Sequence, residues 1–168
     1  AFTHWNEDDP LQVPQECAKC HSGPSFIDFL GQDGSAEFSV DQPGPVGRVI
    51  TCEVCHNEKA HALTLATFPS DETIDLGEGN ALCATCHSGT TSGEYVAISA
   101  SDFDDDEVIA DSSFITPHYA YAATTLYGTE TKGGYEYAEK IYVGKFYHAE
   151  DVQTCTQCHD AHNLRTRV

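Results

Sequence analysis

Apolar residues occur along this chain in short runs that are separated by turn-forming residues. The longest uninterrupted run is five residues, at 119–123, and none approaches the roughly 18 apolar residues needed to cross a bilayer. The sequence contains 13 glycines and 7 prolines that interrupt the runs. The pattern therefore predicts mostly irregular loops, a few short α-helices and little β structure, with no membrane span.

The first half of the chain has one clear helical pattern. Residues 1–16 include Pro10 and Pro14, so they are expected to form an arm without regular structure. Residues 25–30 group Phe26, Phe29 and Leu30 as an apolar turn, which predicts a short helix that ends at a glycine. Residues 48–51 are expected to be extended, and weak alternation over residues 62–82 predicts a small hairpin or an irregular cover.

The second half has a stronger helical signal. Thr116 and Pro117 fit the cap and first position of a helix that runs through an alanine-rich stretch to Leu126 and stops at Gly128. This helix is expected to carry His118 on its first turn. Aromatic residues among glycines over residues 129–147 predict a short extended pair.

Four copies of Cys-x-x-Cys-His dominate the chemistry of the sequence. The motif is typical of c-type haem attachment, with two thioether bonds to the porphyrin and one axial imidazole on iron. Zinc sites and disulfides are the alternatives, but zinc binding does not require a histidine directly after the second cysteine. The motifs use all eight cysteines: Cys17, Cys20, Cys52, Cys55, Cys83, Cys86, Cys155 and Cys158 as thioether donors, with His21, His56, His87 and His159 as proximal ligands.

Four haems in so short a chain determine the expected fold class. The 168 residues leave 42 for each haem, too few for a separate polypeptide domain around each one. The covalently bound porphyrins would supply the apolar mass of a shared core. The sequence therefore predicts a multihaem cytochrome c fold, a single domain over residues 1–168 with an arm over 1–16.

Charge and composition bear on partners and location. The formal net charge of −19 argues strongly against nucleic-acid binding and disfavours anionic membrane surfaces. The chain does not begin with methionine, which suggests that Ala1 follows a removed signal peptide. Because haem is attached to this motif outside the cytoplasmic membrane, we expect an exported protein.

Two charged segments have competing interpretations. The acidic run over residues 102–107 lacks the spacing of a calcium loop, so a solvated surface is favoured over a cation site. Arg165 and Arg167 either contact haem propionates or an acidic neighbour, or they are exposed tail charges.

The remaining histidines are candidates for the sixth ligand of each iron. The sequence contains no methionine, which excludes Met/His ligation. Five candidates for four positions predict bis-histidine iron throughout, with one histidine surplus. The distal candidates are His4, His61, His118, His148 and His162.

Spacing restricts two of these candidates. His162 follows the proximal His159 by three residues, so it cannot reach the opposite face of the same haem and is expected to ligate another one. The same argument applies less strictly to His61 and His56. Shared ligation of this kind predicts closely packed haems.

The expected function follows from iron whose six coordination positions are all occupied. With both axial positions occupied there is no open site for a substrate, so we expect no enzymatic activity and no catalytic residues. The chemistry that remains is the movement of single electrons between neighbouring haems.

The segments between the motifs add a specific resemblance. Ile50-Thr-Cys-Glu-Val-Cys-His56, Ala81-Leu-Cys-Ala-Thr-Cys-His87, Pro117-His-Tyr-Ala-Tyr-Ala-Ala and Lys132-Gly-Gly-Tyr-Glu-Tyr are among the stretches that carry it. Over nearly its whole length the chain resembles the extracellular tetrahaem cytochromes of the OmcE type, which polymerise into filaments.

The resemblance implies a homopolymer with one continuous haem stack. In such a polymer a histidine of one subunit completes the iron of the next, and a head-to-tail contact of this kind generates filaments. His4 and His162, near the chain ends, are the better candidates for this role. Other redox proteins or extracellular electron acceptors would be the partners.

Two other readings remain open. One is a soluble periplasmic shuttle that resembles cytochrome c₃ and takes all its ligands from a single chain. The other is the electron-input subunit of a larger membrane oxidoreductase.

Overall fold

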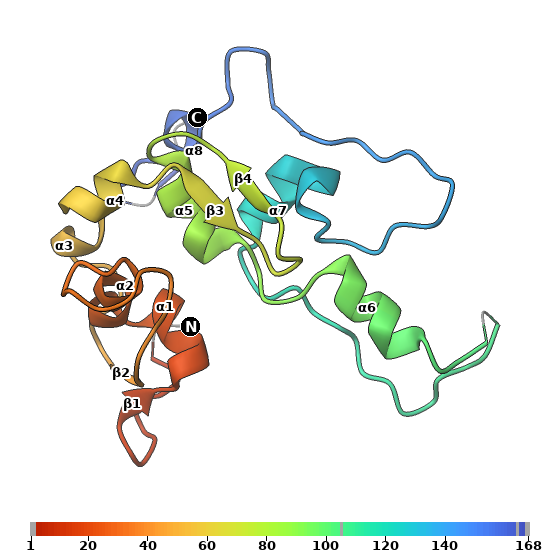
Figure 1. Ribbon diagram of the computed structural model, residues 1–168, viewed down its shortest axis with the longest axis horizontal. Coiled ribbons are helices and arrows are strands. Elements are labelled where there is room, and N and C mark those ends of the chain that lie inside the picture. Colours follow the sequence, from red (N-terminus) through yellow and green to blue (C-terminus); the bar gives the residue numbers. More distant parts are fainter. Residues whose placement is uncertain (1–2, 105, 164, 167–168) are drawn as a thin grey trace. The chain divides into compact units, whose positions relative to one another are not determined.

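The computed structural model describes residues 3–104, 106–163 and 165–166. Ala1, Asp105 and Arg167, which entered the sequence predictions, lie outside the described residues. The described chain is mostly loops, with helices of four to eight residues and two small two-stranded sheets, which confirms the coarse fold prediction (Figure 1). It divides into two compact units, residues 1–63 and 64–168. The prediction of one domain stays a prediction.

The first unit is built from four helices and one small sheet. Helix α2 begins at Gly23, two residues earlier than predicted, with proline at its first turn. Its predicted end is confirmed, because Gly31 has a φ of +65° and donates its amide to the carbonyl of Asp28 at 2.7 Å. The helices are α1 (Gln15–His21), α2 (Gly23–Phe29), α3 (Cys52–Cys55) and α4 (Glu58–Ala62).

The predicted arm is not wholly irregular. Its residues Gln12–Val13 form strand β1, which pairs antiparallel with β2 (Gly44–Pro45). Val13 is buried, and a side chain at Gly44 would meet the hydroxyl groups of Ser25 and Ser22 at 2.2 and 2.6 Å. The expectation of an unstructured arm is therefore wrong at β1. Residues 48–51 form bends, so the expected extended run is also absent there.

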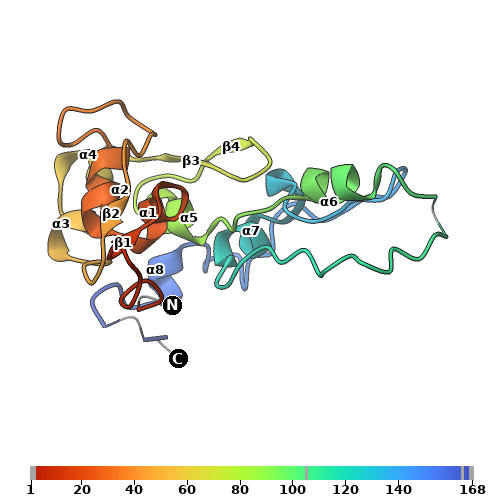
Figure 2. The same ribbon diagram turned by 90° about the horizontal axis from the view of Figure 1, so that it is seen from below.

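The second unit contains the predicted hairpin. Strands β3 (Leu65–Thr67) and β4 (Thr73–Asp75) pair antiparallel, with Ala66 opposite Ile74. Figures 1 and 2 show the hairpin beside α5, against which β3 packs. The helices of this unit are α5 (Asn80–His87), α6 (Gly93–Ala100), α7 (Ala122–Tyr127), the 3₁₀ helix η1 (Gly128–Thr131) and α8 (Cys155–Cys158).

Two sequence predictions fail in the second unit. The helix expected from Thr116 begins only at Ala122, and His118 lies in the preceding loop with a φ of +83°. Its predicted stop at Gly128 is confirmed. Residues 132–147 contain turns and no described strand, so the expected extended pair is wrong. No helix in the described ranges has the length and apolarity that a bilayer crossing requires.

Candidate haem attachment sites

Each of the four motifs begins on a helical turn. Motif 1 lies on α1, motif 2 on α3, motif 3 on α5 and motif 4 on α8. Cysteines three residues apart lie on the same side of a helix, and in each motif the histidine ends the helix or follows it directly. Two thiols on one side with an imidazole at the helix end fit the two vinyl groups and the iron of one porphyrin. The donor set therefore fits haem.

Motif 1 lies beside the start of the chain. The ring of Trp5 meets that of His21 edge-on with a centroid separation of 5.0 Å, and the ring of His4 lies 4.9 Å from Trp5. Burial, with a further contribution from Glu16, raises the pKa of the Cys17 thiol. The structure thus brings the distal candidate His4 into the neighbourhood of motif 1.

Motif 2 is joined to a distal candidate by a single asparagine. Asn57 caps α4 by accepting the Ala60 amide at 2.8 Å, and it donates its side-chain amide to the Glu53 carbonyl of α3 at 2.7 Å. These two bonds fix the turn between the helices. The rings of His56 and His61 consequently lie 6.0 Å apart, tilted by 56°.

Motif 3 shows the tautomer of its histidine. The Nδ1 atom of His87 lies 2.7 Å from the carbonyl oxygen of Ala120. Because a carbonyl can only accept, Nδ1 must be the donor in this contact. Metal-ligating histidines almost always donate their second nitrogen in this way. Nε2 is therefore the nitrogen of His87 that is left to face iron.

Motifs 3 and 4 meet at their first cysteines. The side-chain carbonyl of Asn80, at the start of α5, accepts the backbone amide of Cys155 at 3.0 Å. A hydrogen bond with the Cys83 thiol lowers the pKa of Cys155 to about 7. The structure thus places the attachment points of the third and fourth predicted haems side by side, although they are far apart in sequence.

Tyr127 covers this meeting point. Its side chain is buried, and burial, followed by the charges of Cys155 and Tyr147, raises its pKa to about 12. Lys145 lies over the ring, 5.8 Å from its centroid, and pairs with Glu130 at 3.5 Å. An aromatic wall therefore closes one side of the Cys83–Cys155 contact.

A side chain within motif 4 binds the backbone that leads into the motif. The Gln157 side-chain oxygen accepts the backbone amides of Gln153 and Thr154, each at 2.8 Å. After the motif, the carboxylate of Asp160 accepts the amide of His162 at 2.9 Å, which turns the chain back. His162 is exposed at this turn.

The other two distal candidates lie in loops of the same unit. His118 precedes Ala120, the residue that accepts from His87, and its ring lies 6.0 Å from that of Tyr119. His148 is exposed next to the isolated bridge between Ala149 and Val152. The loop that carries His118 therefore lies beside motif 3, whereas His148 lies in an exposed loop.

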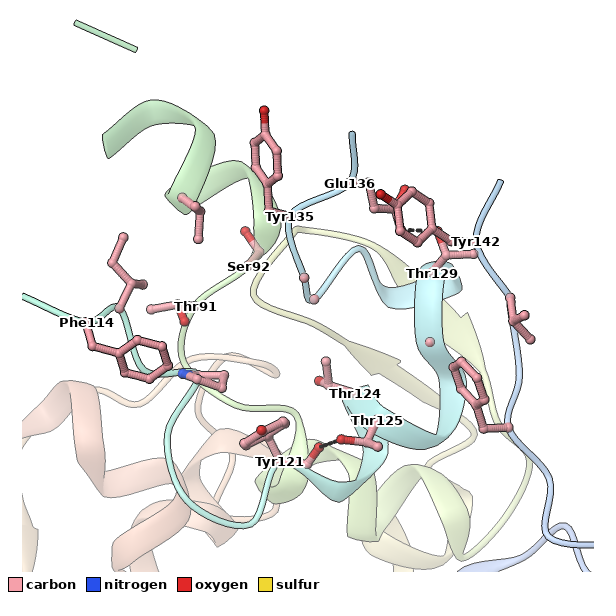
Figure 3. Close-up of a pocket in the computed structure, with 18 residues that line it drawn as sticks. Thr91, Ser92, Phe114, Tyr121, Thr124, Thr125, Thr129, Tyr135, Glu136 and Tyr142 are labelled. Carbon is pink, nitrogen blue, oxygen red and sulfur yellow. Dashed lines mark hydrogen bonds between the residues drawn. The ribbon is translucent and has the colours of Figure 1, made fainter. Parts of the chain in front are cut away.

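An aromatic cavity of about 450 Å³ opens beside α7 in the second unit (Figure 3). Tyr121, Tyr135 and Tyr142 contribute to its wall, and Thr124 lies on its floor. Its lining includes no cysteine or histidine. Aromatic side chains from several loops of the second unit thus surround a hollow surface.

The two charged segments are exposed where the structure describes them. Asp104 and Glu107 are linked by two hydrogen bonds, from the Asp104 amide to the Glu107 carboxylate at 3.2 Å and from the Glu107 amide to the Asp104 carbonyl at 2.9 Å. Arg165 offers its carbonyl to the Asp160 amide at 2.9 Å. Within the described ranges, no group of three or more histidine, cysteine or acidic side chains is arranged to hold a metal ion.

Sequence reasoning missed four residues of these sites. Asn80, Ala120, Thr124 and Tyr127 all act through partners distant in sequence, and no local pattern marks them. Comparison of the chain with protein-family models, curated proteins and solved structures gave no match.

Proposed function

We propose that this chain is an electron-transfer protein with four covalently attached haems. The contact between Cys83 and Cys155 carries the proposal, because haems attached at these two residues would be immediate neighbours. Each haem, when bound, holds or releases a single electron at its iron. The chain's own residues supply the thioether donors, orient the imidazoles and hold neighbouring attachment points together.

The His87 tautomer supports ligation by a second, independent observation. Its Nδ1 proton is committed to Ala120, so the lone pair on Nε2 is available to iron. Bis-histidine ligation would leave no open iron position, so we infer that the protein has no enzymatic activity of its own.

We further propose that the protein is exported and is the repeating subunit of an extracellular filament. This follows from the resemblance of the intervening segments to filament-forming tetrahaem cytochromes. Exposed apolar side chains along the second unit agree with a chain that is covered by neighbours in an assembly; they include Tyr95, Ile98, Val108, Phe114, Tyr119, Tyr137 and Ile141.

Two measurements, made one after the other, test the proposal. Intact-mass analysis with a pyridine haemochrome assay should show four haems per chain on the native protein, whereas bound zinc or four disulfides would overturn the haem assignment. Electron microscopy of the native secreted protein should then show filaments with a regular subunit repeat. Discrete particles of one chain's mass would overturn the filament and favour a diffusing shuttle.

A further inference from the structure

We propose that the loop 116–121 sets the reduction potential of the haem held at motif 3, and that Thr124 positions this loop. The loop acts through one atom, the Ala120 carbonyl oxygen, which accepts the Nδ1 proton of His87 at 2.7 Å. The inference rests on the proposed haem ligation. It adds that the reduction potential depends on a residue outside the motif, because Ala120 lies 33 residues from His87 in the chain.

Two hydrogen bonds fasten the loop, and a third fastens the helix α7 that follows it, to the segment after His87. The Thr90 amide donates to the Pro117 carbonyl at 3.0 Å, and the Thr91 hydroxyl donates to the Thr116 carbonyl at 3.1 Å. The buried hydroxyl of Thr124 donates to the carbonyl of Ser88, the residue directly after His87. The proximal imidazole and its acceptor are therefore held by one set of contacts.

The backbone of the loop depends on these contacts. Ala120 has a φ of +55°, in the left-handed region that costs energy for any residue with a Cβ. Gly89 faces the loop so closely that a Cβ there would lie 2.7 Å from the Pro117 carbonyl. The surrounding bonds thus hold a conformation that the loop sequence alone does not favour.

The expected effect on the iron has a definite sign. A hydrogen bond from Nδ1 to a carbonyl raises the basicity of the imidazole and so favours the ferric ion over the ferrous ion. Loosening that bond should therefore move one of the four reduction potentials to a more positive value. The irons whose axial ligands lie outside residues 116–121 should keep their potentials.

The first test uses two substitutions at Thr124 in the native, haem-loaded protein. Thr124→Val keeps the side-chain shape and removes the hydroxyl, while Thr124→Ser keeps the hydroxyl. Redox titration followed in the haem absorption bands should show one potential shifted upward in Thr124→Val and restored toward the native value in Thr124→Ser. Four unchanged potentials in Thr124→Val would overturn the positioning role.

The second test uses Ala120, because its backbone conformation can be altered directly. Ala120→Gly relieves the positive φ and should leave all potentials in place, whereas Ala120→Pro cannot adopt this φ and should shift the same potential as Thr124→Val. The Nδ1 proton of His87, followed by NMR in the paramagnetic protein, should exchange with deuterium faster in Ala120→Pro. An Nδ1 proton that exchanges at the native rate would contradict the proposal.

Haem content separates failure of this inference from failure of the proposed function. Four haems with unaltered potentials in both disruptive variants would refute the loop's role and leave electron transfer standing. A native chain without covalent haem would refute the proposed function, and the loop proposal with it.

Discussion

The Asn80 side chain accepts a hydrogen bond from the Cys155 amide at 3.0 Å, across 75 residues of sequence. The Asn80 amide nitrogen also donates to the Leu76 carbonyl at 3.3 Å, so one side chain joins the start of α5 to the start of α8. Besides the thiol contact, this is a direct polar link between motifs 3 and 4. Removing the Asn80 side chain is therefore the most specific way to loosen the contact between motifs 3 and 4.

Asn80→Ala should therefore lower the free energy of unfolding by about 1 kcal/mol, the net value of a typical hydrogen bond. In the haem-loaded protein it should also weaken the exciton splitting of the Soret circular dichroism, because neighbouring haems would be less rigidly oriented. Ser35→Ala is the matched control, since the Ser35 hydroxyl donates to the Asp28 carbonyl at 3.1 Å within the first unit, outside every motif, and its loss also costs about 1 kcal/mol. Equal loss of splitting in both variants would contradict a role specific to motifs 3 and 4.

The chain's single tryptophan reports on the arm. Because Trp5 lies 5.0 Å from His21, a haem at motif 1 should quench its fluorescence. Gly44→Ala inserts a methyl group against Ser25 and Ser22, which should separate β2 from β1 and release the arm, so that the emission rises.

Gly134→Ala provides the control for this fluorescence measurement, because nothing lies within 4 Å of a Cβ at that position. It should keep the native quenched emission. Emission that stays quenched in Gly44→Ala would show that β1 does not hold the arm in place.

The cysteines of the haem-free chain should differ in reactivity. A pKa of about 7 makes half of the Cys155 thiol a thiolate at pH 7, whereas the pKa of Cys17 is raised above its usual value of 9.0. After allowance for the weaker nucleophilicity of the more acidic thiol, Cys155 should alkylate about 5- to 10-fold faster than Cys17. Timed labelling with iodoacetamide and peptide mass spectrometry measures the ratio.

The pH dependence of that labelling has a predicted shape. The Cys155 rate should level off above its pKa, while the Cys17 rate should still be rising at pH 9. Cys83→Ser tests the cause, because a weaker sulfur contact should alter the Cys155 profile and leave that of Cys17 unchanged. Identical profiles for the two thiols in the native sequence would argue against the contact.

Replacement of the distal candidates tests the ligand count. Single alanine substitutions of His4, His61, His118, His148 and His162 should each be examined for a high-spin, five-coordinate signal. Four variants should show one such iron and the fifth should remain low-spin, since five imidazoles compete for four positions. His162→Ala with an unchanged low-spin spectrum would refute its assignment to a neighbouring haem.

The elements that the sequence predicted correctly depend on local chemistry. The end of α2 needs only a glycine in the left-handed conformation, and the β3–β4 hairpin needs only short-range pairing. The four motifs can likewise be recognised from sequence, because the two cysteines and the histidine of each lie within five consecutive residues. The structure places each of these motifs on its own helical turn.

The failures occur where distant contacts outweigh local preference. Thr116 and Pro117 form a good helix-start signal, but the Pro117 carbonyl bonds to the Thr90 amide and Ala120 turns toward His87. The helix therefore begins after these contacts, at Ala122. Strand β1 was missed for the same reason, because its partner strand is formed by Gly44 and Pro45.

The long return from α5 to α8 has a consequence for how the protein is made. The chain is synthesised from its N-terminus, so motif 3 is made before motif 4, and the residue that completes the Asn80 contact follows 75 positions later. A chain interrupted before Cys155 would have three of the proposed attachment sites but lack the neighbour of the third. The contact between α5 and α8 is therefore formed only when the last part of the second unit has been made, and truncated copies would lack the proposed electron path between motifs 3 and 4.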